Sequence, residues 1–188
     1  MKKPLFAFVL VLVFASSTYS QDQNVTLDKT QFTLSILPLM AHVEVKAAEK
    51  QSFTFGGGLA YSVFYQNING EGDLEAYTSP FLTTSFRNYY KRNQVKKSNL
   101  RNNSGNYVGL LSSYTFESIV TVGGDTFATD LDTFTIGPVW GFQRNYASGI
   151  HLDLSLGIGY ITGQSDEFIE IENGVTLIGG FEFGFRFN

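Results

Sequence analysis

Hydrophobic and polar residues alternate along most of the chain from residue 31 to the C-terminus. The final stretch shows this best: from Val175 to Phe187 every odd position except Gly179 is apolar, while Glu182 and Arg186 occupy even positions. Alternation with a period of two places the two sets on opposite faces of a β-strand. One face of this final strand therefore carries phenylalanines, and the other carries charge.

The same alternation, broken by turn-forming residues, predicts eight strands. They cover Gln31–Pro38, Ala41–Ala48, Ser52–Tyr65, Glu75–Tyr90, Asn106–Glu117, Leu131–Tyr146, Ile150–Tyr160 and Gly174–Asn188. Across Leu39–Met40 the apolar positions change from even to odd numbers, which a continuous strand can do only through a bulge. Pro38 also disfavours an uninterrupted central strand. A tight hairpin is therefore favoured for residues 31–48, with one bulged strand as the alternative.

The polar faces consist largely of small residues. In the third strand they are Ser52, Thr54, Gly56, Gly58, Ala60 and Ser62. A secreted lipocalin-like barrel would bury its apolar face, whereas a transmembrane barrel turns that face toward lipid. Small residues suit a narrow interior, and a wet surface has no need of them. We therefore predict an all-β fold, an eight-stranded antiparallel up-and-down transmembrane β-barrel whose lumen is filled by side chains.

The connections between the strands predict which end of such a barrel faces the cell exterior. With both chain ends in the periplasm, the outer connections are Pro38–Met40, Gln66–Asp73, Ser118–Asp130 and Gly163–Asn173. The periplasmic connections are then Ala48–Gln51, Lys91–Gly105 and Asn145–Gly149. Bacterial barrels have short periplasmic turns. The long Lys91–Gly105 connection departs from that rule.

Residues 1–20 have the features of a secretory signal peptide. Lys2 and Lys3 precede a short apolar run from Leu5 to Ala15, and small residues near Ser20 permit cleavage. A membrane anchor is the alternative, but the run is shorter than the ~20 residues that a spanning helix needs. Residues 21–29 are polar and are expected to form a flexible lead-in, so the barrel domain is predicted to span residues 30–188.

Composition narrows the function further. Charged residues are only 16% of the 188 residues, against about a quarter in a typical soluble domain. The net charge of −4 is opposite to that of a nucleic-acid-binding protein, so no nucleic-acid partner is expected. The absence of cysteine excludes disulfides, thiolate metal sites and cysteine nucleophiles.

The two histidines are the residues most open to a chemical role. His42 and His151 each stand two positions from an acid on the same face, Glu44 and Asp153, which is compatible with an acid–base or metal pair. Ser155 would complete a Ser-His-acid set, but neighbours on one strand face do not create triad geometry. We interpret both histidines as hydrogen-bonded lumen residues, and predict no enzyme, catalytic residue, metal or cofactor.

The remaining charged residues on polar faces predict a structural network inside the lumen. Glu44, Arg87 and Arg186 are its best candidates, and a plug is favoured over a proton or ion path. The complete predicted set is His42, Glu44, Arg87, His151, Asp153, Glu182 and Arg186.

Several segments together resemble the small eight-stranded outer-membrane β-barrel proteins of Gram-negative bacteria, in particular compact families of uncharacterised function. The matching segments are the signal, Val43–Val45, Phe86–Tyr90, Gly149–Tyr160 and the aromatic last strand. Family members end in an aromatic residue that resembles a signal for the barrel-insertion machinery, whereas here Phe187 is penultimate. The resemblance implies a protein of the cell outer membrane, with outer-membrane lipid and the insertion machinery as partners. Its expected role is structural, adhesive or surface-recognition, through extracellular loops that meet an unidentified ligand. A small lipid-modifying enzyme and a secreted lipocalin-like binding barrel are the alternatives.

Overall fold

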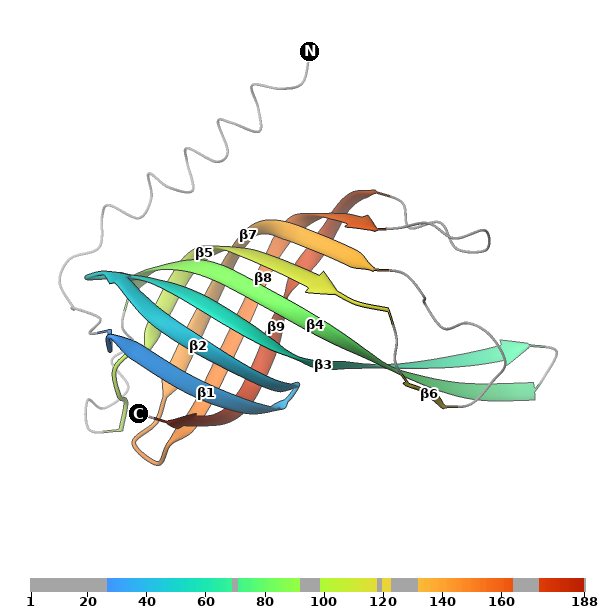
Figure 1. Ribbon diagram of the computed structural model, residues 1–188, viewed down its shortest axis with the longest axis horizontal. Helices are drawn as coiled ribbons and strands as arrows, with labels where there is room; N and C mark the ends of the chain where they lie inside the picture. The colour runs from blue at the N-terminus through green and yellow to red at the C-terminus, as the bar shows by residue number, and fades with distance from the viewer. Residues whose placement is uncertain are drawn as a thin grey trace, which may run out of the picture.

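The computed structural model describes residues 27–68, 71–91, 99–117, 120–122, 132–163 and 173–187. The strands, shown in Figure 1, are β1 (Thr30–Leu37), β2 (Leu39–Ala48), β3 (Gln51–Ile68), β4 (Glu71–Lys91), β5 (Gly105–Thr115), β6 (Val120–Val122), β7 (Thr133–Asn145), β8 (Ile150–Gly163) and β9 (Gly174–Phe187). No helix in the described part of the chain is long and apolar enough to cross a membrane. The predicted signal peptide lies outside the described residues.

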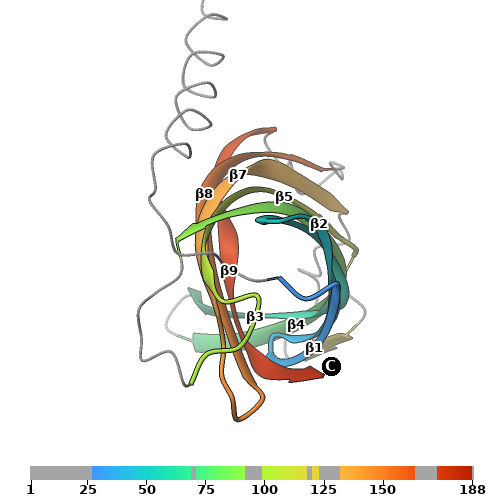
Figure 2. The same cartoon turned by 90° about the vertical axis from the view of Figure 1, so that its left-hand side faces the viewer.

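Eight of these strands close into a ring, as the end-on view of Figure 2 shows. Each of the eight pairs antiparallel with its neighbours, and β1 pairs with β9, so that the first and last strands complete the circle. The short β6 stands apart from the ring and pairs only with the outer part of β4, at Ala76–Thr78. The prediction of eight antiparallel up-and-down strands is therefore confirmed for the described residues.

Residues 31–48 form a hairpin. Ser35 pairs with Met40 and Ile36 pairs with Leu39, so the chain reverses at Pro38. The reversal accounts for the change of parity across Leu39 and Met40, because each strand then keeps its apolar residues on the outside. The hairpin prediction is confirmed, and the alternative of one bulged strand is wrong.

The prediction of a loop over Gln66–Asp73 is wrong for the residues that are described. Pairing continues through Gln66↔Asp73 and Ile68↔Glu71. The β3–β4 hairpin consequently reaches far beyond the ring (Figure 1). Asn and Gly lower strand propensity, but two antiparallel strands satisfy each other's backbone groups whatever their side chains are.

Most large apolar side chains of the ring are exposed on its outside, whereas the buried side chains are mostly polar, with Met40, Tyr89, Tyr107, Val139 and Ile178 as buried exceptions. The outward set includes Phe32, Phe55, Leu82, Leu156, Ile158, Leu177 and Phe185. The inward set includes Gln31, Thr33, Ser52, Thr54, Ser85, Gln143 and Asp153. The exposed fraction is 62% for Leu156 on β8 but 2% for Asp153 on the same strand. A lipocalin-like barrel would show the reverse arrangement, with its apolar face lining the interior.

Two chain segments pack across the end of the ring that carries the β7–β8 turn. Asp28 donates its backbone N–H to Asn103 Oδ1 at 2.7 Å, and Asn102 Nδ2 donates to Asp28 Oδ1 at 2.7 Å. Leu27 is buried in the same region, so the described end of the predicted lead-in is held against the ring. The end of the predicted Lys91–Gly105 loop is likewise ordered, with Asn103 fully buried.

Close strand packing leaves no room for a side chain at Gly157 on β8. A Cβ there would lie 2.0 Å from Pro138 O and 2.9 Å from Val139 Cα, whereas one at Gly180 on β9 would meet nothing within 4 Å. We expect Gly157→Ala to lower the free energy of unfolding by about 1–3 kcal/mol through overpacking. Gly180→Ala, the matched control, should leave it unchanged or raise it by up to about 1 kcal/mol. Urea unfolding of the refolded protein measures both, and equal values would contradict the packing described.

Candidate functional site

Arg87 on β4 is at the centre of the polar interior. Its Nη1 donates to Asp153 Oδ2 at 2.9 Å and also to Gln143 Oε1. Its Nε donates to Ser85 Oγ at 3.1 Å, and the guanidinium lies over the Tyr107 ring at 4.6 Å from the ring centre. One buried cation thus connects strands β4, β5, β7 and β8.

Glu44 on β2 is fully buried and is the second charged residue of this network. It accepts hydrogen bonds from Ser52 Oγ at 2.6 Å, from Tyr89 OH at 2.8 Å and from Gln143 Nε2 at 2.9 Å. Because the Gln143 amide also accepts from Arg87, it joins the carboxylate to the guanidinium. A buried carboxylate with several donors avoids much of the desolvation cost that an unpaired charge would carry.

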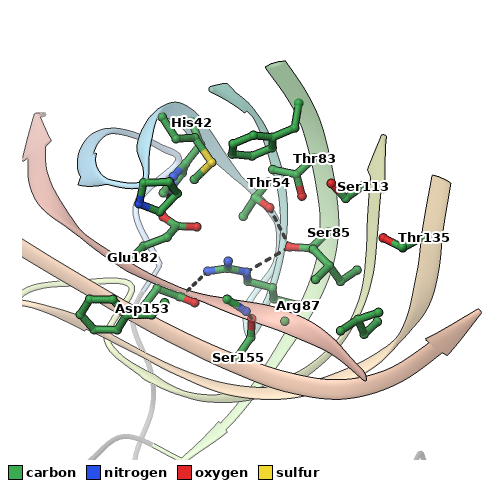
Figure 3. Close-up of a pocket in the computed structure, with 18 of the residues that line it drawn as sticks. His42, Thr54, Thr83, Ser85, Arg87, Ser113, Thr135, Asp153, Ser155 and Glu182 are labelled. Carbon is green, nitrogen blue, oxygen red and sulfur yellow. Dashed lines mark hydrogen bonds and ion pairs between the residues drawn. The ribbon is translucent and has the colours of Figure 1, made fainter. Parts of the chain in front are cut away.

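His42, His151 and Glu182 form a second cluster beside the first, on β2, β8 and β9. Glu182 Oε2 lies 3.2 Å from His42 Nδ1 and 3.8 Å from His151 Nε2. The two imidazole rings meet edge to face, with 5.4 Å between their centres. Ser35 Oγ donates to the same Glu182 oxygen at 3.3 Å. Figure 3 shows His42 and Glu182 on one side of the interior, close to Asp153 and Arg87.

Arg186, in contrast, is not part of either cluster. It lies near the end of β9, where Nη2 donates to Asp28 Oδ2 at 3.1 Å and Nη1 donates to Asn102 O at 3.3 Å. The predicted grouping of Glu44, Arg87 and Arg186 therefore fails for Arg186. Alternation correctly placed Arg186 on the inner face of β9. Its position near the end of that strand, however, separates it from Glu44 and Arg87 at the centre of the ring.

A cavity of about 360 Å³ adjoins both clusters. Its polar lining includes Arg87, Asp153, Glu182 and His42, which Figure 3 draws, and its apolar lining includes the buried Ile178 of β9. The cavity therefore ends on the charged residues, while Asn103 and its neighbours lie at the far end of the ring.

The Ser-His-acid set of Ser155, His151 and Asp153 is not assembled. Ser155 Oγ accepts from Gly180 N at 3.2 Å, and Asp153 is engaged with Arg87 and Tyr107. His151 Nδ1 lies 2.7 Å from Asn145 Oδ1 rather than from an acid. These three side chains consequently do not form a nucleophilic triad. This agrees with the argument that neighbours on one strand face do not create triad geometry.

Several central residues were not predicted as site residues. They are Tyr89, Tyr107, Gln143, Asn145 and Asn103. Parity alone places the first four on inner faces, but alternation does not tell which inward residue stands at the height of Arg87. Asn103 belongs to an Asn-rich connection, which sequence reasoning treats as solvated.

Comparison of the chain with protein-family models, with curated proteins and with solved structures gave no match. Function must therefore be inferred from the ring and from the side chains inside it.

Proposed function

We propose that the protein is an integral β-barrel of the outer membrane of a Gram-negative bacterium, exported by a cleaved signal peptide. The observation that supports this most strongly is the orientation of the strands, with large apolar side chains outside and buried charges inside. Full burial of one such side chain is worth roughly 1.5–3 kcal/mol, so leaving the whole set in water would forgo a large stabilisation. A lipid bilayer would cover these side chains with hydrocarbon. A closed ring would also leave no unpaired strand edge exposed to that hydrocarbon.

The filled interior favours a role other than conduction. Arg87, Glu44 and Gln143 join opposite strands, and the segment around Asn103 packs across one end. Ions would have to break this network to pass. We therefore expect no conductance in planar bilayers, and we assign no pore activity to the protein.

The proposed role is structural, adhesive or surface-recognition, through the parts that extend beyond the ring. Among the described residues, the β3–β4 hairpin extends furthest beyond the ring, with pairing that continues to Ile68↔Glu71. In the proposed orientation this hairpin points away from the cell, where it could meet a ligand. Outer-membrane lipid surrounds the barrel, and the insertion machinery is the partner during biogenesis.

An epitope tag placed in two different turns tests the proposal. One tag is inserted in the turn between Ile68 and Glu71, and the matched control tag lies between Ala48 and Gln51. Intact cells should bind antibody to the first tag only, and permeabilised cells should bind antibody to both. The protein should sediment with outer membranes and migrate faster on gels without boiling.

Two results would contradict this proposal. Recovery of the untagged protein in the soluble periplasmic fraction would exclude a membrane barrel. Labelling of the Ala48–Gln51 tag on intact cells would show that the orientation is reversed.

A further inference from the structure

Three side chains from three strands bring potential metal ligands together in the interior. The donor atoms of His42, His151 and Glu182 all lie within 4.8 Å of one another. Zinc bonds of ~2.0–2.2 Å to nitrogen and oxygen place tetrahedral ligands about 3.3–3.5 Å apart. The distances of 3.2 Å and 3.8 Å from Glu182 Oε2 to the two histidines are close to that spacing. Modest side-chain rotation would bring all three atoms to one ion.

The hydrogen bonds of Asn145 fix the tautomer of His151. Gln31 Oε1, Asn102 O and Asn103 O each lie 3.0 Å from Asn145 Nδ2, and the two N–H groups of this amide are directed toward these three acceptors. The amide oxygen therefore faces His151 Nδ1 at 2.7 Å and must accept its proton. In a neutral His151 the Nε2 atom therefore carries no proton. Its lone pair is directed at the Glu182 carboxylate. Metal-binding histidines are oriented in this way, with the second ring nitrogen donating to an oxygen.

His42 supplies an independent observation. The ring is buried; among the described residues its Nε2 has no hydrogen-bond partner, and the polar atom that faces its Nδ1 is the Glu182 carboxylate oxygen at 3.2 Å. His151 Nε2 is likewise buried and without a hydrogen bond in that part of the chain. A buried polar group without a partner lowers stability, because it has lost its hydrogen bonds to water. Two imidazole nitrogens directed at one carboxylate oxygen are satisfied together by a cation between them.

From these observations we propose that His42, His151 and Glu182 bind one divalent transition-metal ion of the Zn²⁺ class. Two imidazoles and a carboxylate are ligands for Zn²⁺, Cu²⁺, Ni²⁺ or Fe²⁺, whereas Ca²⁺ and Mg²⁺ prefer oxygen ligands alone. His42 and Glu182 line the cavity, which gives the ion an entry path and leaves coordination positions open toward that space. The proposal does not depend on where the ring resides in the cell.

The test uses the mature chain without a histidine tag, refolded in detergent, treated with a chelator and dialysed free of it. Zn²⁺ is titrated by calorimetry, and Co²⁺ by its visible absorption. We expect one ion per chain, retained in millimolar Mg²⁺, with the intense Co²⁺ spectrum of a four- or five-coordinate site. The chain has only two histidines, so the imidazole contribution to the spectrum is assignable.

Three variants locate the ion. Asn145→Ala should weaken Zn²⁺ binding by about 10–100-fold, the usual cost of losing an outer-shell partner. Glu182→Gln should weaken it more than that. Glu49→Gln, which removes an exposed carboxylate in the β2–β3 turn, should leave Zn²⁺ binding unchanged.

The proposal is overturned if the folded wild-type protein, verified by gel migration without boiling, shows no saturable Zn²⁺ binding. It is equally overturned if Glu182→Gln binds Zn²⁺ as tightly as wild type, or if Mg²⁺ displaces the ion. Failure of Glu182→Gln to refold leaves the wild-type titration and the spectrum as the deciding measurements.

Discussion

Replacing Arg87 by methionine should lower the free energy of unfolding by about 3–5 kcal/mol, because it leaves buried carboxylates without their cation. Methionine keeps much of the length of the side chain but removes every hydrogen bond to Asp153, Gln143 and Ser85. The decrease in the free energy of unfolding therefore measures mainly the lost hydrogen bonds and ion pair, and only to a small extent a change in packing. Urea unfolding in detergent micelles measures it, followed by the fluorescence of the single tryptophan, Trp140.

Two further variants separate this effect from a general change of charge. Arg101→Met removes an arginine that is exposed at the end of the ring, and should change the free energy of unfolding by less than about 0.5 kcal/mol. Arg87→Met combined with Asp153→Asn should recover part of the loss, since the carboxylate left unpaired is then neutral. If Arg87→Met is no less stable than Arg101→Met, the interior network does not hold the ring together.

The overall fold was predictable because the period of a strand is fixed. Alternation assigned Leu154 and Leu156 to one face and Asp153 to the other, and β1 follows the same rule, with Phe32 and Leu34 exposed and Gln31 and Thr33 buried. The change of parity at Met40 even located the first hairpin. The long β3–β4 hairpin was missed because its outer pairs, such as Ile68↔Glu71, are held by backbone hydrogen bonds that leave no pattern in the side chains.

The sequence predicted which side chains point into the ring, but it did not predict how far along the ring axis each of them lies. Sequence parity selects inward residues, so Arg87 and Arg186 looked equivalent, yet strand stagger places one at the centre and the other at the rim. Stagger is set by pairing between distant strands, such as β1 with β9, which a single sequence does not display. The same limit hid the meeting of His42 with His151, which are 109 positions apart in the chain.

Placing a charge in the middle of the apolar belt should destabilise the protein in lipid and leave it nearly unaffected in water. Leu156 lies midway along β8 and is 62% exposed, so Leu156→Arg disturbs little packing. In a bilayer, arginine at this depth should cost about 2–4 kcal/mol, because the guanidinium must enter hydrocarbon. On a water-exposed surface the same change should stay within about 0.5 kcal/mol. Urea unfolding from phosphatidylcholine vesicles, followed by circular dichroism, measures the difference.

Ala47→Arg is the matched control, since Ala47 is exposed near the β2–β3 turn, next to the exposed Lys46. At that height the arginine reaches the headgroup region and should cost no more than about 1 kcal/mol. A depth-dependent penalty requires hydrocarbon around the ring, because water would treat the two positions alike. Equal and small penalties for Leu156→Arg and Ala47→Arg would therefore mean that the apolar belt is covered by something other than a bilayer.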